Sequence, residues 1–227
     1  MPELYFDPRT LDEAGCPAWI SALAGEEHDP NHLVHVVRDL EPADALELLG
    51  VDRQAIRPCE LPTRNPGELT PLARAAIHPL NPTVVLMAAR IGDWTFIYDD
   101  LGETLCLWHL PDRPPMDATE ALSIKGKVAA TGNIAITGQV GFTYAVNGKI
   151  LVQETEDVPS STELGENTPA KVRAAVKAAG IFDSGDDYGV SMRMICALAG
   201  LPRTLDELRQ IPLLVAPLDS RPYLFRP

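Results

Sequence analysis

Runs of apolar and polar residues divide the chain into a β-rich part and a helical part. Before residue 156, short runs rich in valine, isoleucine and aromatic residues alternate with turn residues, which is typical of strands. The clearest runs lie at residues 32–40, 84–91 and 94–98 and in a meander over residues 127–155. After residue 167, apolar residues recur at helical spacing, which predicts helices at residues 169–179, 188–199 and 204–211.

Two short turns indicate how the β-rich runs pair. Asn147-Gly148 separates two of these runs, and both residues tolerate the positive φ angles of a two-residue hairpin turn. Gly92-Asp93 separates another two runs in the same way. We therefore predict an α+β fold, in which the C-terminal helices pack on a curved, mainly antiparallel sheet of about five to seven strands.

Helix caps give the boundaries of two shorter helices. Pro42 suits the first turn of a helix, Asp44 suits its positive end, and Gly50 suits its C-terminal cap. Asp117 is followed three residues later by Glu120, a capping pattern that predicts a short helix beginning there. A strand followed by a helix is thus expected at the start of the folded domain.

Proline residues mark the parts of the chain expected outside this domain. Residues 1–31 contain four prolines and one short candidate helix, so we expect an N-terminal arm that docks through its apolar residues. A single α+β domain is predicted over residues 32–211, interrupted by an irregular, proline-rich excursion at residues 51–82. Residues 212–227 are expected to form a proline-rich C-terminal tail.

Composition narrows the class of protein. The 227 residues are 45% hydrophobic and 22% charged, as in ordinary globular proteins. The start of the sequence lacks the pattern of a signal peptide, and no long apolar run occurs, so a cytoplasmic protein is expected. The cysteines are far apart, which predicts reduced thiols rather than a disulfide framework or a zinc site: Cys16, Cys59, Cys106 and Cys196.

The formal net charge is −13, and all the acidic excess lies before residue 158. Such a field repels phosphate backbones and anionic lipid, so neither nucleic acid nor membrane is an expected partner. It would instead steer a basic protein toward the chain. The alternative is that the acidity serves only solubility.

Six short segments, taken in their order along the chain, resemble the sequences of a protein family. They are VRDLEPADALELLG at 37–50, ARIGDWTFIY at 89–98, ALS at 121–123, YAVNG at 144–148, LAGL at 198–201 and TLDEL at 204–208. In this order they resemble an actinobacterial family known only as a domain of unknown function. The resemblance implies a bacterial cytoplasmic or phage-related setting, and it implies no activity.

Two groups of side chains are candidates for chemistry or binding. His28, His32 and His35 could bind a divalent metal, but His35 would point away from His32 in a strand, so no metal site is expected. Asp99, Asp100 and Glu103 could bind a hard cation or perform acid–base work, although a turn explains them equally well. Beside an exposed aromatic residue they would instead form a partner-binding patch. Its residues would be Trp94, Tyr98, Asp99, Asp100 and Glu103.

Motifs of nucleotide binding and of serine hydrolases are missing from the sequence, and no cofactor is expected. The leading hypothesis is a non-enzymatic interaction factor of the immunity, antitoxin or phage-defence type, which binds a basic partner through an acidic surface. One alternative is a small-molecule-binding protein or hydrolase with a pocket between sheet and helices. The other alternative is a structural component of a larger assembly.

Overall fold

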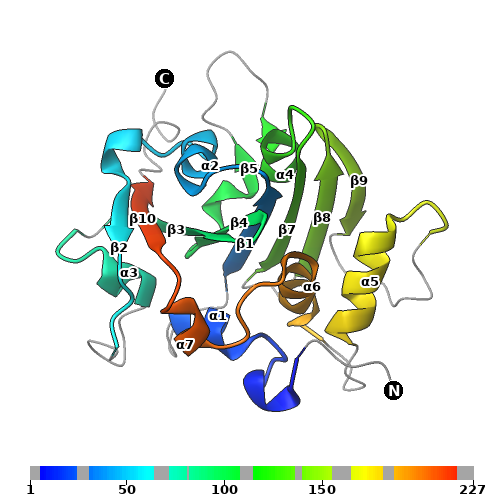
Figure 1. Cartoon of the computed structure of the whole chain (residues 1–227), viewed down its shortest axis with the longest axis horizontal. Coiled ribbons are helices and arrows are strands. Elements are labelled where there is room, and N and C mark those ends of the chain that lie inside the picture. Colours follow the sequence, from blue (N-terminus) through cyan, green and yellow to red (C-terminus); the bar gives the residue numbers. More distant parts are fainter. Residues whose placement is uncertain are drawn as a thin grey trace.

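A computed structural model of the chain describes residues 6–24, 31–63, 72–80, 82–107, 115–135, 140–154, 165–180 and 187–218. At its centre is an antiparallel sheet of eight strands in the order β2-β10-β3-β4-β1-β7-β8-β9 (Figure 1). The strands of this sheet are β1 His32–Arg38, β2 Arg57–Cys59, β3 Val84–Ile91, β4 Trp94–Asp99, β7 Val128–Ile134, β8 Val140–Val146, β9 Lys149–Glu154 and β10 Leu213–Leu218. A second, two-stranded sheet pairs β5 Cys106–Leu107 with β6 Met116–Asp117.

Helices cover both faces of the large sheet (Figure 1). One face carries α2 Pro42–Leu48 and α4 Ala118–Leu122, whose Leu46 and Leu122 pack with Val37 and Ile97. The other face carries the remaining helices, namely α1 Ala18–Ala24, α3 Leu72–Ala76, α5 Ala170–Ala179, α6 Val190–Ala199 and α7 Leu205–Leu208. Three short 3₁₀ turns complete the described elements: η1 Pro8–Thr10, η2 Arg53–Ala55 and η3 Glu103–Leu105.

The predicted α+β class and antiparallel sheet are confirmed, and two details need correction. The sheet has eight strands rather than five to seven. Helices from the first half of the chain pack on it as well as the C-terminal set. The hairpins at Gly92-Asp93 and Asn147-Gly148 and the cap at Asp117, which accepts from Thr119 N and Glu120 N, form as predicted.

Strand β10 lies where a proline-rich tail is predicted. Its residues Leu213, Val215 and Ala216 are buried, and the strand pairs with β3 on one side and β2 on the other. Pro217 is tolerated because it lies opposite Val85, whose amide and carbonyl both bond toward Asp100 on the other side. The nitrogen of Pro217 therefore faces outward, beyond the last residue that pairs with β2.

The described part of the segment expected to form an N-terminal arm belongs to the core of the fold. Trp19, Ile20 and Leu23 of α1 are fully buried beneath the sheet. Arg193 of α6 is also fully buried and donates to Gly15 O at 2.6 Å and to Ala179 O at 2.8 Å. Its guanidinium also pairs with the Asp187 carboxylate, so one side chain joins the arm to the end of α5 and the start of α6.

Both outer strands carry features that blunt the edges of the sheet. Strand β2 has only three residues, one of which is Pro58. In β9, Val152 lies opposite Tyr144 and Ile150 opposite Ala145, so Leu151 is the extra residue of a β-bulge. Short strands, proline and bulges all disfavour pairing with a further strand.

None of the helices in the described ranges has the length and apolarity that crossing a bilayer requires.

Candidate functional site

The histidines do not come together. His28 lies outside the described residues, and His32 and His35 point to opposite faces of β1, as the strand prediction implies. His32 Nδ1 lies 3.3 Å from Tyr98 Oη, and burial lowers the pKa of His32 to about 4. Across the described ranges, no group of three His, Cys, Asp or Glu side chains could hold a metal ion.

His35 belongs to a buried chain of hydrogen bonds on the face that carries α2 and α4. Its Nε2 lies 2.9 Å from Thr104 Oγ1, and its Nδ1 lies 2.7 Å from Thr131 Oγ1, which contacts Thr119 Oγ1 at 2.7 Å. At the other end, Thr104 Oγ1 donates to Asp99 Oδ2 at 2.7 Å. All five side chains of this hydrogen-bonded network are fully buried, and burial lowers the pKa of His35 to about 3.

Asp99 caps a turn, which confirms the turn interpretation of this segment. Its carboxylate accepts from the backbone nitrogens of Leu101, Gly102 and Thr104 at 3.0, 2.9 and 2.8 Å. Burial raises the pKa of Asp99, and these hydrogen bonds oppose that rise. The carboxylate therefore stabilises the connection between β4 and η3.

Asp100 ties β4 to β3 and α3. It accepts from Val85 N at 2.7 Å, and its Oδ2 lies 2.9 Å from Arg74 Nε. Burial raises the pKa of Asp100 to about 6, against the lowering effect of the Val85 hydrogen bond and of Arg74. Asp99, Asp100 and Tyr98 are all buried, so the predicted acidic patch does not form from them. Glu103 is exposed, and Trp94 is half-buried.

Trp94 lies in a row of side chains that crosses one end of the sheet on the α6 face. The strand register sets Ile91 opposite Trp94, Trp94 opposite Arg38, Val128 opposite Val146, and Val146 opposite Lys149. Because Val37 pairs with Ala129, Arg38 lies beside Val128 and the row is continuous. We call this row the shelf; it consists of Ile91, Trp94, Arg38, Val128, Val146 and Lys149.

The shelf is partly open to solvent, whereas the next row inward is not. Lys149 is exposed and the other five side chains are half-buried. The neighbouring row, which is fully or almost fully buried, consists of Ala89, Phe96, Val36, Ala130 and Tyr144. The boundary coincides with the end of α6, which Gly200 caps in a left-handed conformation with φ of 64°. The helix therefore stops before it covers the end of the sheet.

A groove adjoins the Ile91 end of the shelf, where the chain turns from α6 into α7. Its volume is about 370 Å³, and it is lined by Ile91, Gly200, Leu201, Pro202, Arg203, Glu207 and Ile211. The lining is mainly apolar, with one basic and one acidic side chain. The groove is open to solvent.

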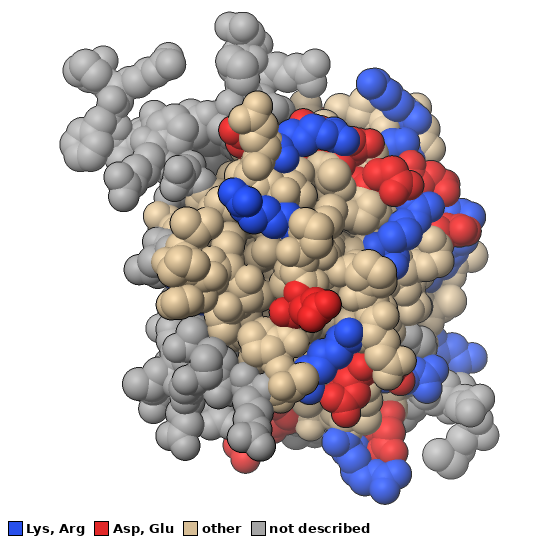
Figure 2. All heavy atoms as spheres, turned by 60° about the vertical axis from the view of Figure 1, so that its left-hand side comes forward, with Lys and Arg blue, Asp and Glu red and all other residues tan. Residues whose placement is uncertain are grey.

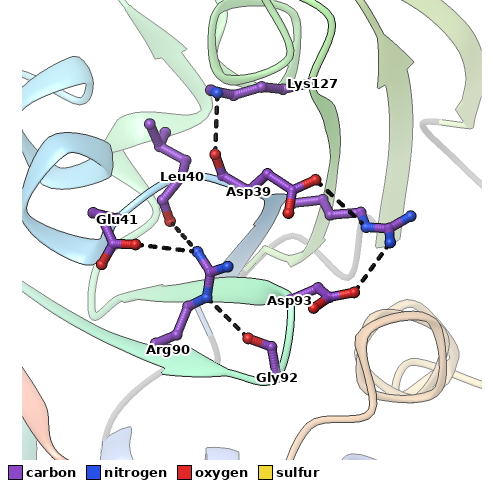
Figure 3. Close-up of polar contacts among 8 residues, drawn as sticks. Asp39, Leu40, Glu41, Arg90, Gly92, Asp93 and Lys127 are labelled. Carbon is purple, nitrogen blue, oxygen red and sulfur yellow. Dashed lines mark hydrogen bonds and ion pairs between the residues drawn. The ribbon is translucent and has the colours of Figure 1, made fainter.

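Charged side chains form ion pairs and hydrogen bonds that link the strand ends at the shelf (Figure 3). Arg38 pairs with Asp93 at 3.0 Å and with Asp39 at 3.6 Å, and Lys127 Nζ donates to Asp39 O at 3.1 Å. Arg90 donates to Leu40 O and Gly92 O, and its guanidinium lies 3.6 Å from the Glu41 carboxylate. Two of the six segments on which the family resemblance rests, 37–50 and 89–98, meet at this corner.

Charge is mixed over the described part of the chain. Its ranges contain 20 acidic and 15 basic residues by count along the sequence, or 5 of the 13 net negative charges. On the side that carries β2 and β10, side chains of both signs lie among large uncharged areas (Figure 2). Among the described residues on that side, acidic side chains do not form a continuous surface.

Comparisons with models of protein families, with curated proteins and with solved structures find no match. The resemblance to an actinobacterial family therefore stays a prediction that rests on the quoted segments.

Sequence reasoning singled out Trp94 but missed the rest of the shelf. The two hairpins alone predict that Ile91 lies beside Trp94 and that Val146 lies beside Lys149. What joins the hairpins is the pairing of β1 with both β4 and β7, and no local signal indicates it.

Proposed function

We propose that this protein is a non-enzymatic interaction factor that binds a partner protein through the shelf. The observation that carries the proposal is the half-buried row with Trp94 and Arg38 at its centre. Tryptophan and arginine are the residue types most enriched at energetic hot spots of interfaces. The flanking Ile91, Val128 and Val146 would exclude water around them.

The buried polar groups support a binding role over a catalytic one. His35 and Asp99 have the chemistry of a general base, but both are fully buried and bonded to threonine hydroxyls or backbone amides. A general base must reach the proton of a bound substrate. Their position instead suits residues that hold together β1, β4, β7 and α4.

We propose that the partner is basic and that the protein acts as an immunity, antitoxin or phage-defence factor. The net charge of −13 would raise the rate at which a basic protein meets the chain, and added salt would reduce that effect. At the shelf, Arg38 is already paired with two carboxylates, Asp39 and Asp93. A basic side chain of the partner could share them.

The test compares two alanine variants in affinity purification from the native host at low and high salt. Trp94→Ala removes the centre of the shelf, and Leu48→Ala removes a side chain that is 40% exposed on α2, on the opposite face. We expect one basic protein to copurify stoichiometrically with the wild type and Leu48→Ala, and to be lost with Trp94→Ala or at high salt. Equal recovery with both variants would contradict the proposal.

A small-molecule-binding role is the second candidate, and the groove beside Ile91 favours it. Arg203 and Glu207 could orient a small polar ligand over the apolar lining. Screening of the purified protein by thermal shift would test this role. A ligand that stabilises the wild type but not Leu201→Ser would support it, and the protein partner would then be unnecessary.

A further inference from the structure

The turn between β8 and β9 contains the sequence Asn147-Gly148, and the chain has no other Asn-Gly. Both residues have left-handed backbone conformations, with φ of 52° and 72°. In an unrestrained chain, Asn-Gly is the dipeptide most prone to spontaneous deamidation, because glycine leaves its own nitrogen free to approach the asparagine side chain. The turn is thus chemically vulnerable by sequence.

The reaction needs a free glycine nitrogen. Gly148 N loses its proton to solvent and attacks Asn147 Cγ, so an N–C bond forms and the side-chain nitrogen leaves as ammonia. The resulting five-membered succinimide is hydrolysed by water at either carbonyl to an aspartyl or isoaspartyl residue. The step involves no oxidant, and water is the only co-reactant.

Both reacting groups are hydrogen-bonded to the loop that follows α4. Gly148 N donates to Ser123 Oγ at 2.9 Å, and Gly126 N donates to Asn147 Oδ1 at 2.8 Å. Ser123 is fully buried, and its own hydroxyl donates to Glu120 O at 2.9 Å. The hydroxyl proton is therefore committed, and the oxygen presents a lone pair to Gly148 N.

We propose that the β8–β9 turn is a latent deamidation site, which Ser123 holds unreactive by occupying the attacking nitrogen. Deprotonation of Gly148 N would break its hydrogen bond, and attack would require the nitrogen to turn from Ser123 toward Asn147 Cγ. A side-chain carbon at Gly148 would lie 3.4 Å from Ile124 Cγ1, so the turn rests closely against the loop. Reaction would place a new carboxylate between Val146 and Lys149, at the end of the shelf.

The experiment follows Asn147 by peptide mapping and mass spectrometry during incubation of the full chain at mildly alkaline pH. The wild type is compared with Ser123→Ala and with Ser191→Ala. Ser191 is a matched control because it is equally buried and also donates to a backbone carbonyl, Asn133 O at 3.1 Å, away from the turn. Circular dichroism establishes that each variant is folded, and the wild type in urea gives the unrestrained rate.

We expect Asn147 to deamidate about tenfold faster in Ser123→Ala than in Ser191→Ala, the effect of one hydrogen bond of ordinary net strength. Native wild type should also react more slowly than the chain in urea, a comparison that holds even if Ser123→Ala does not fold. Equal rates for the native and unfolded wild type would overturn the proposal. So would a folded Ser123→Ala that reacts no faster than Ser191→Ala.

Discussion

The hydrogen bonds around His35 have one consistent direction when Asp99 is ionised and His35 is neutral. The carboxylate only accepts, so the Thr104 hydroxyl donates to it and must accept from His35 Nε2–H. His35 Nδ1 then accepts from the Thr131 hydroxyl, which in turn accepts from Thr119. Burial favours the neutral form of His35, which then carries its proton on Nε2, and both ring nitrogens have a hydrogen-bond partner.

This environment predicts a loss of stability in mild acid. In the native state the pKa of His35 is about 3. Neutral His35 stabilises the native state at pH values above the pKa that it has in the unfolded chain. This stabilisation is lost as the pH falls from that pKa toward the native pKa. From an unfolded value of about 6.5, the loss between pH ~7 and pH ~5 is about 2 kcal/mol.

Urea unfolding of the wild type and of His35→Gln across this pH range measures the contribution. We expect a smaller loss on acidification in His35→Gln, because glutamine has no charge to acquire. His78→Gln is the control, since His78 is exposed. A pH dependence in His35→Gln as steep as that of the wild type would show that other groups are responsible.

Arg193 gives a second prediction at the scale of one residue. Its guanidinium is fully buried, and replacement by methionine would leave the Asp187 carboxylate and three backbone carbonyls without this donor: those of Gly15, Ala179 and Gly180. We expect Arg193→Met to lower the free energy of unfolding by about 3–5 kcal/mol. Lys177→Met, at an exposed position of α5, should change it little. Similar values for the two variants in chemical unfolding would refute this role.

At the scale of elements, α1 is the segment whose importance the sequence understates. Trp19 packs edge-to-face on Phe96 of β4, with ring centroids 6.1 Å apart, and its buried Nε1 has no hydrogen-bond partner among the described residues. Trp19→Ala should cost about 3–5 kcal/mol because a cavity would remain. Trp19→Phe should cost clearly less, because it keeps a ring and removes the unpaired N–H. Thermal unfolding distinguishes the two variants, and equal losses would contradict this prediction.

Elements with a local signal could be predicted, and those defined by distant pairing could not. The hairpins follow from Gly92-Asp93 and Asn147-Gly148, and the start of α4 follows from Asp117, because these signals lie within a few residues. Strand β10 has an apolar run, but Pro217 makes it look like a tail. Only its place between β3 and the end of β2 explains the tolerance of that proline.

The same distinction between local signals and distant pairing applies to the candidate site. Trp94 is identifiable as an aromatic residue beside a turn. The burial of Asp99 and Asp100 is not, because the sequence of an exposed acidic turn and that of an internal cap look alike. The shelf depends on β1 lying between β4 and β7, which brings together residues from four separate segments.

At the scale of the whole molecule, the sheet is covered on both faces and blunted at both edges. A partner protein is therefore expected to bind at the open end of the sheet rather than by adding a strand. Pro58 occupies the centre of β2, and the Leu151 bulge interrupts β9, so the described edges present few consecutive backbone groups for pairing. The same features predict that two copies of the chain do not associate through their sheets.

Analytical ultracentrifugation of the wild type and of Pro58→Thr tests this prediction. Threonine suits a strand and restores a backbone N–H at the edge, so we expect the variant to self-associate more readily than the wild type. Leu151→Ser is the control for loss of exposed apolar surface, because Leu151 is 45% exposed on the opposite edge. If the wild type is already a stable oligomer that Trp94→Ala dissociates, the shelf is an interface between copies. The proposed hetero-partner would then have to compete with self-association for the same residues.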